Sequence, residues 1–141
     1  LFNSPHEWVP LISERLIDYI RVHVSQAGGL TPCRKMAALA ELFGVKTAWH
    51  GPGDVSPVGH ACNITLDVAC SNFGIQEYMR HTDETDAVFP HAYTFKDGFM
   101  HPGEAPGHGV TIDETLAAKY PYQRAYLPVN RLQHDGTLWN W

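Results

Sequence analysis

One stretch of this chain decides how the rest is interpreted: Trp49-His50-Gly51-Pro52-Gly53-Asp54-Val55-Ser56-Pro57-Val58-Gly59-His60. An apolar run, residues 45–49, leads into it, and a helix-like pattern, residues 61–69, follows. Glycines and prolines punctuate the stretch, which indicates a structured turn between a strand and a helix. Because α/β proteins place their chemistry where strands end and helices begin, we expect a functional site at this turn.

The same alternation continues on both sides of the turn. Apolar, β-branched residues predict a largely buried strand over residues 17–24 and a third strand over residues 73–78. Residues 8–16 predict an amphipathic helix, and another helix begins with Thr31 as N-cap and ends at Gly44. The order helix, strand, helix, strand, helix, strand predicts an α/β fold with a parallel sheet and right-handed crossovers.

Three parallel strands form an incomplete sheet with an open edge, which soluble proteins avoid. Either the sheet closes against another chain, or the chain is the C-terminal part of a larger domain. We favour the second alternative.

The periodic pattern stops after residue 79. Residues 80–141 are rich in proline, glycine, histidine and aromatics, and only residues 112–120 predict a helix. We therefore divide the chain into a segment of the parallel sheet, residues 1–79, and an irregular C-terminal extension, residues 80–141. The extension is expected to pack on other parts of the protein through its aromatic side chains, which are Phe89, Tyr93, Phe95, Phe99, Trp139 and Trp141.

Composition excludes several classes of function. The 141 residues carry a formal net charge of −5 with scattered basic residues, which argues against nucleic acid and anionic membranes as partners. No apolar run approaches the ~18 residues of a membrane span. An odd set of cysteines, Cys33, Cys62 and Cys70, favours reduced thiols and a cytoplasmic location. The nine histidines lack the paired spacing of a dedicated zinc site.

Four side chains near the predicted strand ends form the candidate site: Arg21, His50, Asp54 and Glu77. A guanidinium, an imidazole and two carboxylates suit a polyhydroxylated acid better than an apolar ligand. Each also has a plainer interpretation: a structural ion pair for Arg21, a cap of the turn for His50, a turn residue for Asp54 and a solvated carboxylate for Glu77. His60 and the cysteines are interpreted as packing residues.

Several runs of the sequence resemble the mannonate dehydratase group of the enolase superfamily, whose members are similar to mandelate racemase and muconate lactonizing enzyme. These runs are residues 19–21, 27–31, 50–58, 72–79, 99–103, 117–122 and 135–141. The similarity covers nearly the whole chain and is to the C-terminal third of that family only. It implies the C-terminal part of a modified TIM-type (β/α)7β barrel.

The resemblance also implies an activity. Family members remove water from a sugar acid, typically converting D-mannonate to 2-keto-3-deoxy-D-gluconate, by α-proton abstraction, Mg²⁺ stabilisation of an enediolate and loss of the 3-hydroxyl. On the matching positions, Arg21, His50, Asp54 and Glu77 would bind substrate. The Mg²⁺ ligands, the last immediately before Leu1, and the catalytic base and acid would lie upstream, so the chain itself would supply no metal ligand and no catalytic residue. The intact enzyme would be a homo-oligomer.

Two alternatives stay open. Gly53 stands where many relatives carry a larger polar residue, so the substrate could instead be D-gluconate. The protein could also be a non-catalytic, regulatory family member that binds a sugar acid.

Overall fold

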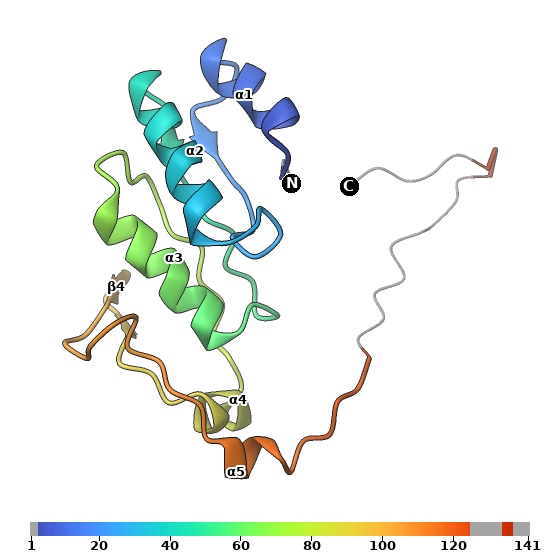
Figure 1. Cartoon of the computed structure of the whole chain (residues 1–141), viewed down its shortest axis with the longest axis vertical. Helices are drawn as coiled ribbons and strands as arrows, with labels where there is room; N and C mark the ends of the chain where they lie inside the picture. Colours follow the sequence, from blue (N-terminus) through green and yellow to red (C-terminus); the bar gives the residue numbers. More distant parts are fainter. Residues whose placement is uncertain (1–2, 125–133, 137–141) are drawn as a thin grey trace.

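The computed structural model describes residues 3–124 and 134–136, in which helices and short strands alternate over the first half (Figure 1). The elements in chain order are α1 (Pro5–Ser13), β1 (Tyr19–Ile20), α2 (Leu30–Leu42), β2 (Lys46–Thr47), α3 (Pro57–Ala69), α4 (Asp83–Val88), β3 (Thr94–Lys96), β4 (Phe99–His101) and α5 (Glu114–Ala117). The order from α1 to α3 is the predicted alternation of an α/β fold.

The sheet is parallel, as expected, but its strands are shorter than predicted. β1 pairs with β2 in the register Tyr19↔Lys46 and Ile20↔Thr47. Parallel hydrogen bonding continues beyond these bounds, because the His50 N–H donates to the Val22 carbonyl at 2.9 Å. The polypeptide from residue 18 to residue 22 therefore runs alongside residues 46–50, although only the first part has regular strand geometry.

The predicted third strand, residues 73–78, is wrong in extent. Phe73 forms a single parallel bridge with Thr47, on the side of β2 opposite β1. The amides of Gly74 and Ile75 both donate to the Thr47 carbonyl, at 3.1 and 3.2 Å. Because two donors share one acceptor, the regular ladder stops there and the chain continues toward residue 77 in an irregular path.

Two helices begin earlier than their apolar patterns predict. α1 starts at Pro5, where Ser4 and Glu7 form a reciprocal capping box, so Pro10 lies inside the helix rather than in its first turn. α3 starts at Pro57, because the Ser56 side chain accepts the Gly59 N–H at 3.3 Å. In both cases the capping residue, a serine before a proline, fixes the first turn.

The prediction of Thr31 as the N-cap of α2 is wrong. Gly29, at φ 97°, is the N-cap, without a side-chain hydrogen bond. The predicted end is correct, since Gly44 has φ 72° and forms a Schellman motif. In that motif the Gly44 N–H donates to the Glu41 carbonyl at 3.1 Å, and the Val45 N–H donates to the Ala40 carbonyl at 2.9 Å.

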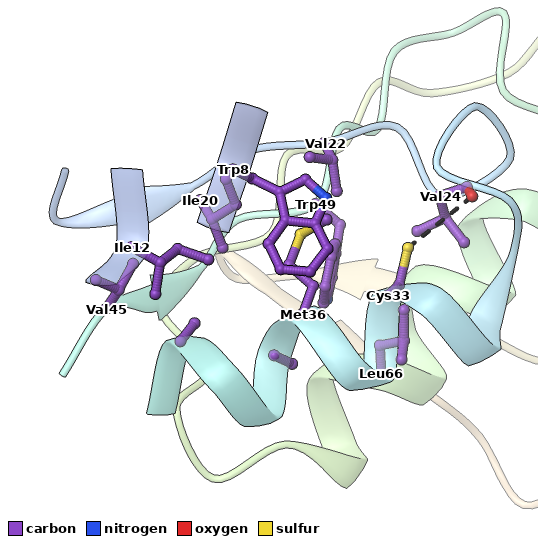
Figure 2. Packing of buried hydrophobic residues seen from close by; sticks show 12 residues of the cluster. Trp8, Ile12, Ile20, Val22, Val24, Cys33, Met36, Val45, Trp49 and Leu66 are labelled. Carbon is purple, nitrogen blue, oxygen red and sulfur yellow. Dashed lines mark hydrogen bonds between the residues drawn. The ribbon is translucent and has the colours of Figure 1, made fainter. Parts of the chain in front are cut away.

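The main hydrophobic core lies between this short sheet and the helices α1, α2 and α3 (Figure 2). Trp49 and Met36 are fully buried in it, and side chains from α1 and from the β1 strand surround them. The alternation along residues 20–24 is that of a strand with one face in the core: Ile20, Val22 and Val24 are buried, whereas Arg21 is exposed. This pattern turns Arg21 away from the core.

The C-terminal extension contains elements that periodicity did not predict. β3 and β4 form an antiparallel hairpin, and Asp97 and Gly98, at φ 53° and 82°, make its tight turn. α4 precedes the hairpin. α5 is shorter than the predicted helix over residues 112–120, and it packs beside α4 (Figure 1).

One aromatic of the extension is a true anchor. Tyr93 is buried against Ala61 and Ile64 of α3. Phe95 and Phe99 are more than half exposed, although the Phe95 ring lies against the Tyr78 ring with a centroid distance of 5.4 Å. Trp139 and Trp141 lie outside the described residues. The two-part division and the packing of the extension on other segments remain predictions.

The three cysteines are free, with Cys33 buried and the other two partly buried. Across residues 3–124 and 134–136, no helix is long and apolar enough to cross a membrane.

Candidate functional site

The ends of the parallel strands bring three of the four predicted site residues together. Arg21 directly follows β1, His50 lies three residues after β2, and Glu77 lies four residues after the bridge at Phe73. Parallel strands end at the same edge of a sheet, so residues distant in sequence meet there. This edge is where the sequence predicted the site.

Glu77 is the centre of the group. Its two carboxylate oxygens accept hydrogen bonds from Nη2 of Arg21 at 2.9 and 2.8 Å. Oε2 also lies 3.6 Å from Nε2 of His50 and accepts the Gly51 N–H at 3.0 Å. The carboxylate therefore joins a guanidinium, an imidazole and a backbone amide, and its plain interpretation as a merely solvated strand end is wrong.

Gly51 allows this close approach. A Cβ at this position would collide with the Glu77 carbonyl oxygen, so any larger residue would force the two segments apart. The Met79 N–H donates to the Gly51 carbonyl at 3.0 Å. Backbone contacts thus fix residues 77–79 against the turn that follows His50.

The pKa values of the group follow from burial and charge. Partial burial and the Arg21 charge lower the pKa of His50, although the Glu77 and Asp54 carboxylates act in the opposite direction. Burial alone would raise the pKa of Glu77, but the Gly51 N–H, Arg21 and His50 outweigh it and lower that pKa. At neutral pH the group therefore combines a carboxylate, a guanidinium and a neutral imidazole.

Asp54 stands apart from this cluster. Its side chain is exposed and forms no hydrogen bond or ion pair with the residues that the structure describes. It lines, together with His50, a cavity of about 430 Å³ between the loops that follow β1 and β2. Asp54 therefore shares a surface with His50 but does not contact Arg21 or Glu77.

The turn from residue 49 to residue 60 is held by buried polar side chains rather than by a capping histidine. His60 and His81 donate from Nε2 to the carbonyls of Pro52 and Val55, at 3.2 and 2.6 Å. Asn63 of α3 donates to the His50 carbonyl at 3.1 Å. The interpretation of His60 as a packing residue is confirmed, since it is 2 % exposed.

Sequence reasoning missed His23. It lines the same cavity as His50 and Asp54, and its ring meets the His50 ring edge to face with a centroid distance of 5.6 Å. The signal was present, because His23 lies two residues after Arg21 and side chains two apart share a face of a strand.

The chemistry of the donor set does not match a Mg²⁺ site. Within residues 3–124 and 134–136, no group of three or more histidine, cysteine or acidic side chains could hold a metal ion. Glu77 is already paired with Arg21, and Asp54 lies apart from it. The residues present are suited to hydrogen bonding a polar ligand and not to coordinating a cation.

A family model described as enolase C-terminal domain-like matches residues 2–116. A D-mannonate dehydratase of Caulobacter vibrioides is 62% identical over 138 residues, covering 96% of this chain and 34% of the relative. A D-galactonate dehydratase family member of Chromohalobacter salexigens is 59% identical over the whole chain and 35% of its own length. The chain thus spans about a third of the length of the curated relatives it matches.

Solved structures show the same architecture. The crystal structure of an enolase from Pantoea ananatis, with bound D-gluconate and magnesium, aligns with a TM-score of 0.83 at 48% sequence identity. The alignment covers 86% of this chain and 29% of that one.

Proposed function

Because this chain belongs to the enolase C-terminal domain-like family, we propose that it forms the substrate-binding C-terminal third of a sugar-acid dehydratase. The resemblance to the mannonate dehydratase group is confirmed by relatives of that name. The expected fold class, the C-terminal part of a (β/α)7β barrel, is confirmed by the family match and the structural neighbour. The reaction we propose is loss of water from D-mannonate to give 2-keto-3-deoxy-D-gluconate.

The observation that carries the proposal is the meeting of Arg21, His50 and Glu77 at the carboxyl edge of the parallel sheet. These groups offer both hydrogen-bond donors and acceptors at one place, as recognition of a hydroxylated anion requires. An apolar ligand would leave the Arg21 N–H groups that do not bond Glu77 without partners, at a cost of about 1–3 kcal/mol for each group it desolvates.

Each side chain has a role that follows from its charge. The Arg21 guanidinium has free N–H groups beside those bonded to Glu77, and these would attract the carboxylate of the substrate. Glu77, held ionised by Arg21 and the Gly51 amide, accepts hydrogen bonds from substrate hydroxyls. Neutral His50 offers a ring nitrogen to the same ligand, and Asp54 binds a hydroxyl from across the cavity.

We propose that Mg²⁺, the base that removes the α-proton and the acid that assists the leaving hydroxyl come from segments upstream of this chain. The role we propose for the residues of this chain is binding and orientation of the sugar acid. The free cysteines agree with a cytoplasmic enzyme. We keep a homo-oligomer as the expected assembly.

Replacing His50 in the full-length enzyme tests this assignment. We expect His50→Asn to lower kcat/KM for D-mannonate at least tenfold, about 1.4 kcal/mol, because a hydrogen-bonding group at the site is displaced. His6→Asn, the same substitution at an exposed position of α1, serves as the control and should leave kcat/KM unchanged. Product formation is followed as 2-keto-3-deoxy-D-gluconate, and wild-type turnover by His50→Asn would remove His50 from the site.

D-gluconate is the second candidate substrate, since the enolase from Pantoea ananatis was crystallised with it. Measuring kcat/KM of the wild-type enzyme for both epimers decides between them. Binding of a sugar acid without turnover of either epimer would instead support the regulatory family member.

A further inference from the structure

His23 occupies a position in the sheet that places it beside the proposed site. The register Tyr19↔Lys46 and Ile20↔Thr47, continued by the hydrogen bond from the His50 N–H to the Val22 carbonyl, sets His23 opposite His50. Side chains alternate between the two faces of a strand, so His23 lies on the face of Arg21 and opposite the buried Val22 and Val24.

Of the two ring nitrogens of His23, only Nδ1 has a hydrogen-bond partner in the described part of the chain. Its Nδ1 lies 2.9 Å from Oγ of Ser25, and its ring packs edge to face on His50 at an interplanar angle of 75°. Among the described residues, Nε2 of His23 has no hydrogen-bond partner. The serine hydroxyl can either donate or accept, so it fixes the ring and leaves Nε2 to act as acceptor or donor.

The surroundings of Nε2 suit a small polar ligand. His23, His50 and Asp54 all line the cavity of about 430 Å³ between the loops after β1 and β2, and this volume lies in the usual range for small-molecule sites. Asn63 lines it as well, and its Oδ1 is a buried acceptor that has no hydrogen-bond partner in the described part of the chain. The cavity therefore extends the Arg21–His50–Glu77 cluster with groups that bind hydroxyls.

We propose that His23 is a further substrate-binding residue, whose Nε2 hydrogen-bonds a hydroxyl group of the sugar acid in this cavity. The inference rests on the proposed sugar-acid function and deepens it, by assigning the cavity beyond His50 to the hydroxylated chain of the ligand. His50 belongs to both groups: its Nε2 lies 3.6 Å from Glu77, which pairs with Arg21, and it lines the cavity together with His23 and Asp54.

Two amide substitutions distinguish the two ring nitrogens. The amide of glutamine reaches the position of Nε2, whereas the amide of asparagine reaches only the position of Nδ1. In the wild type, Nδ1 is already hydrogen-bonded to Ser25. In the full-length enzyme, we measure the dissociation constants of D-mannonate and D-gluconate by calorimetry for wild type, His23→Gln and His23→Asn. His6→Asn is the matched control, and thermal unfolding checks that each variant is folded.

The proposal predicts a specific order of affinities. His23→Asn should weaken binding about five- to tenfold, as loss of one neutral hydrogen bond does, and His23→Gln should stay within about threefold of wild type. Equal affinity of His23→Asn and wild type would overturn the proposal. So would a loss in His23→Gln as large as that in His23→Asn, because a purely structural role of the aromatic ring predicts equal losses. A structural role of Nδ1 alone predicts the reverse order, with His23→Gln weaker than His23→Asn, and that order would overturn the proposal as well.

Turnover of the wild-type enzyme separates this inference from the proposed function. Binding that depends on His23 without any turnover would contradict the dehydratase and support the inference. Turnover with an unaffected His23→Asn variant would support the dehydratase and contradict the inference. A wild-type enzyme that binds neither sugar acid would contradict both.

Discussion

The two halves of this chain are stabilised in different ways. Residues 3–79 bury a continuous apolar cluster around Trp49 and Met36, to which α1, β1, α2 and α3 all contribute (Figure 2). In the described extension, residues 80–124, only His81, Val88 and Tyr93 are buried. Burial of a large apolar surface stabilises the first half, whereas a few individual contacts stabilise the second half.

In the extension, polar contacts take the place of a large buried apolar surface. The carboxylate of Asp86 lies 3.6 Å from His81 and 3.3 Å from His91. The His91 ring stacks on Tyr93 at 3.8 Å between centroids and donates from Nδ1 to the Tyr93 carbonyl at 3.0 Å. Such contacts depend on single atoms, so a point substitution is expected to release the extension without unfolding the sheet.

The largest effect is expected at the centre of the main core. Trp49→Ala removes a fully buried indole and should lower the free energy of unfolding of the full-length protein by about 3–5 kcal/mol. Urea denaturation measures the change, with Tyr122→Ala as an exposed aromatic control expected within about 0.5 kcal/mol of wild type. A loss of stability in Trp49→Ala no larger than that in Tyr122→Ala would contradict the view that buried apolar surface stabilises this half.

The second effect tests whether the extension depends on one anchor. Tyr93→Ala should cost about 3 kcal/mol, because it empties the space between α3 and the hairpin. The loss should be local: in hydrogen exchange, the Ala92 and Thr111 amides, bonded to carbonyls within the extension, lose protection. The His50 amide in the parallel ladder should keep its protection.

Tyr93→Phe is the matched variant. The Tyr93 hydroxyl is buried without a hydrogen-bond partner among the described residues, so its removal should change stability by less than about 1 kcal/mol. Loss of protection in both halves after Tyr93→Ala would show that the halves unfold together, and the comparison would fail.

The smallest effect on stability is expected in α3, the helix of the first half against which Tyr93 of the extension packs. Burial raises the pKa of Asp67 to about 7, and its Oδ1 has no partner among the described residues. Between the ordinary pKa of 3.8 and about 7, the folded state therefore binds more protons than the unfolded state. Stability conferred by the protonated carboxyl is consequently lost as the pH rises through this window.

Asp67→Asn should remove this dependence, since an amide stays neutral throughout. We expect the variant to be about 1 kcal/mol more stable than wild type at pH 8 and no more stable at pH 4, measured by thermal unfolding at both values. Asp18→Asn, at an exposed carboxylate, should show no such difference between the two pH values. A gain of equal size at pH 4 would contradict the assigned cause.

The candidate site could be predicted from the sequence where strand ends carried ionisable residues. Arg21, His50 and Glu77 were found because parallel strands end at one edge, whereas the ion pair between Arg21 and Glu77 joins residues 56 positions apart. His23 does not stand out in the sequence, because a histidine between two valines fits the pattern of a buried strand. Only the register of β1 and β2 places it beside His50.

The sequence alone determined the alternation of helices and strands, because apolar residues recur with the period of each element in the half that buries an apolar face. It also contained the capping serines and the Asp97–Gly98 dipeptide, which is typical of a tight hairpin turn. Tertiary structure alone decided where the strands end, since the shared Thr47 carbonyl and the close approach at Gly51 depend on neighbouring segments. It likewise decided which aromatic anchors the extension, because burial of Tyr93 depends on the position of α3 and not on any local pattern.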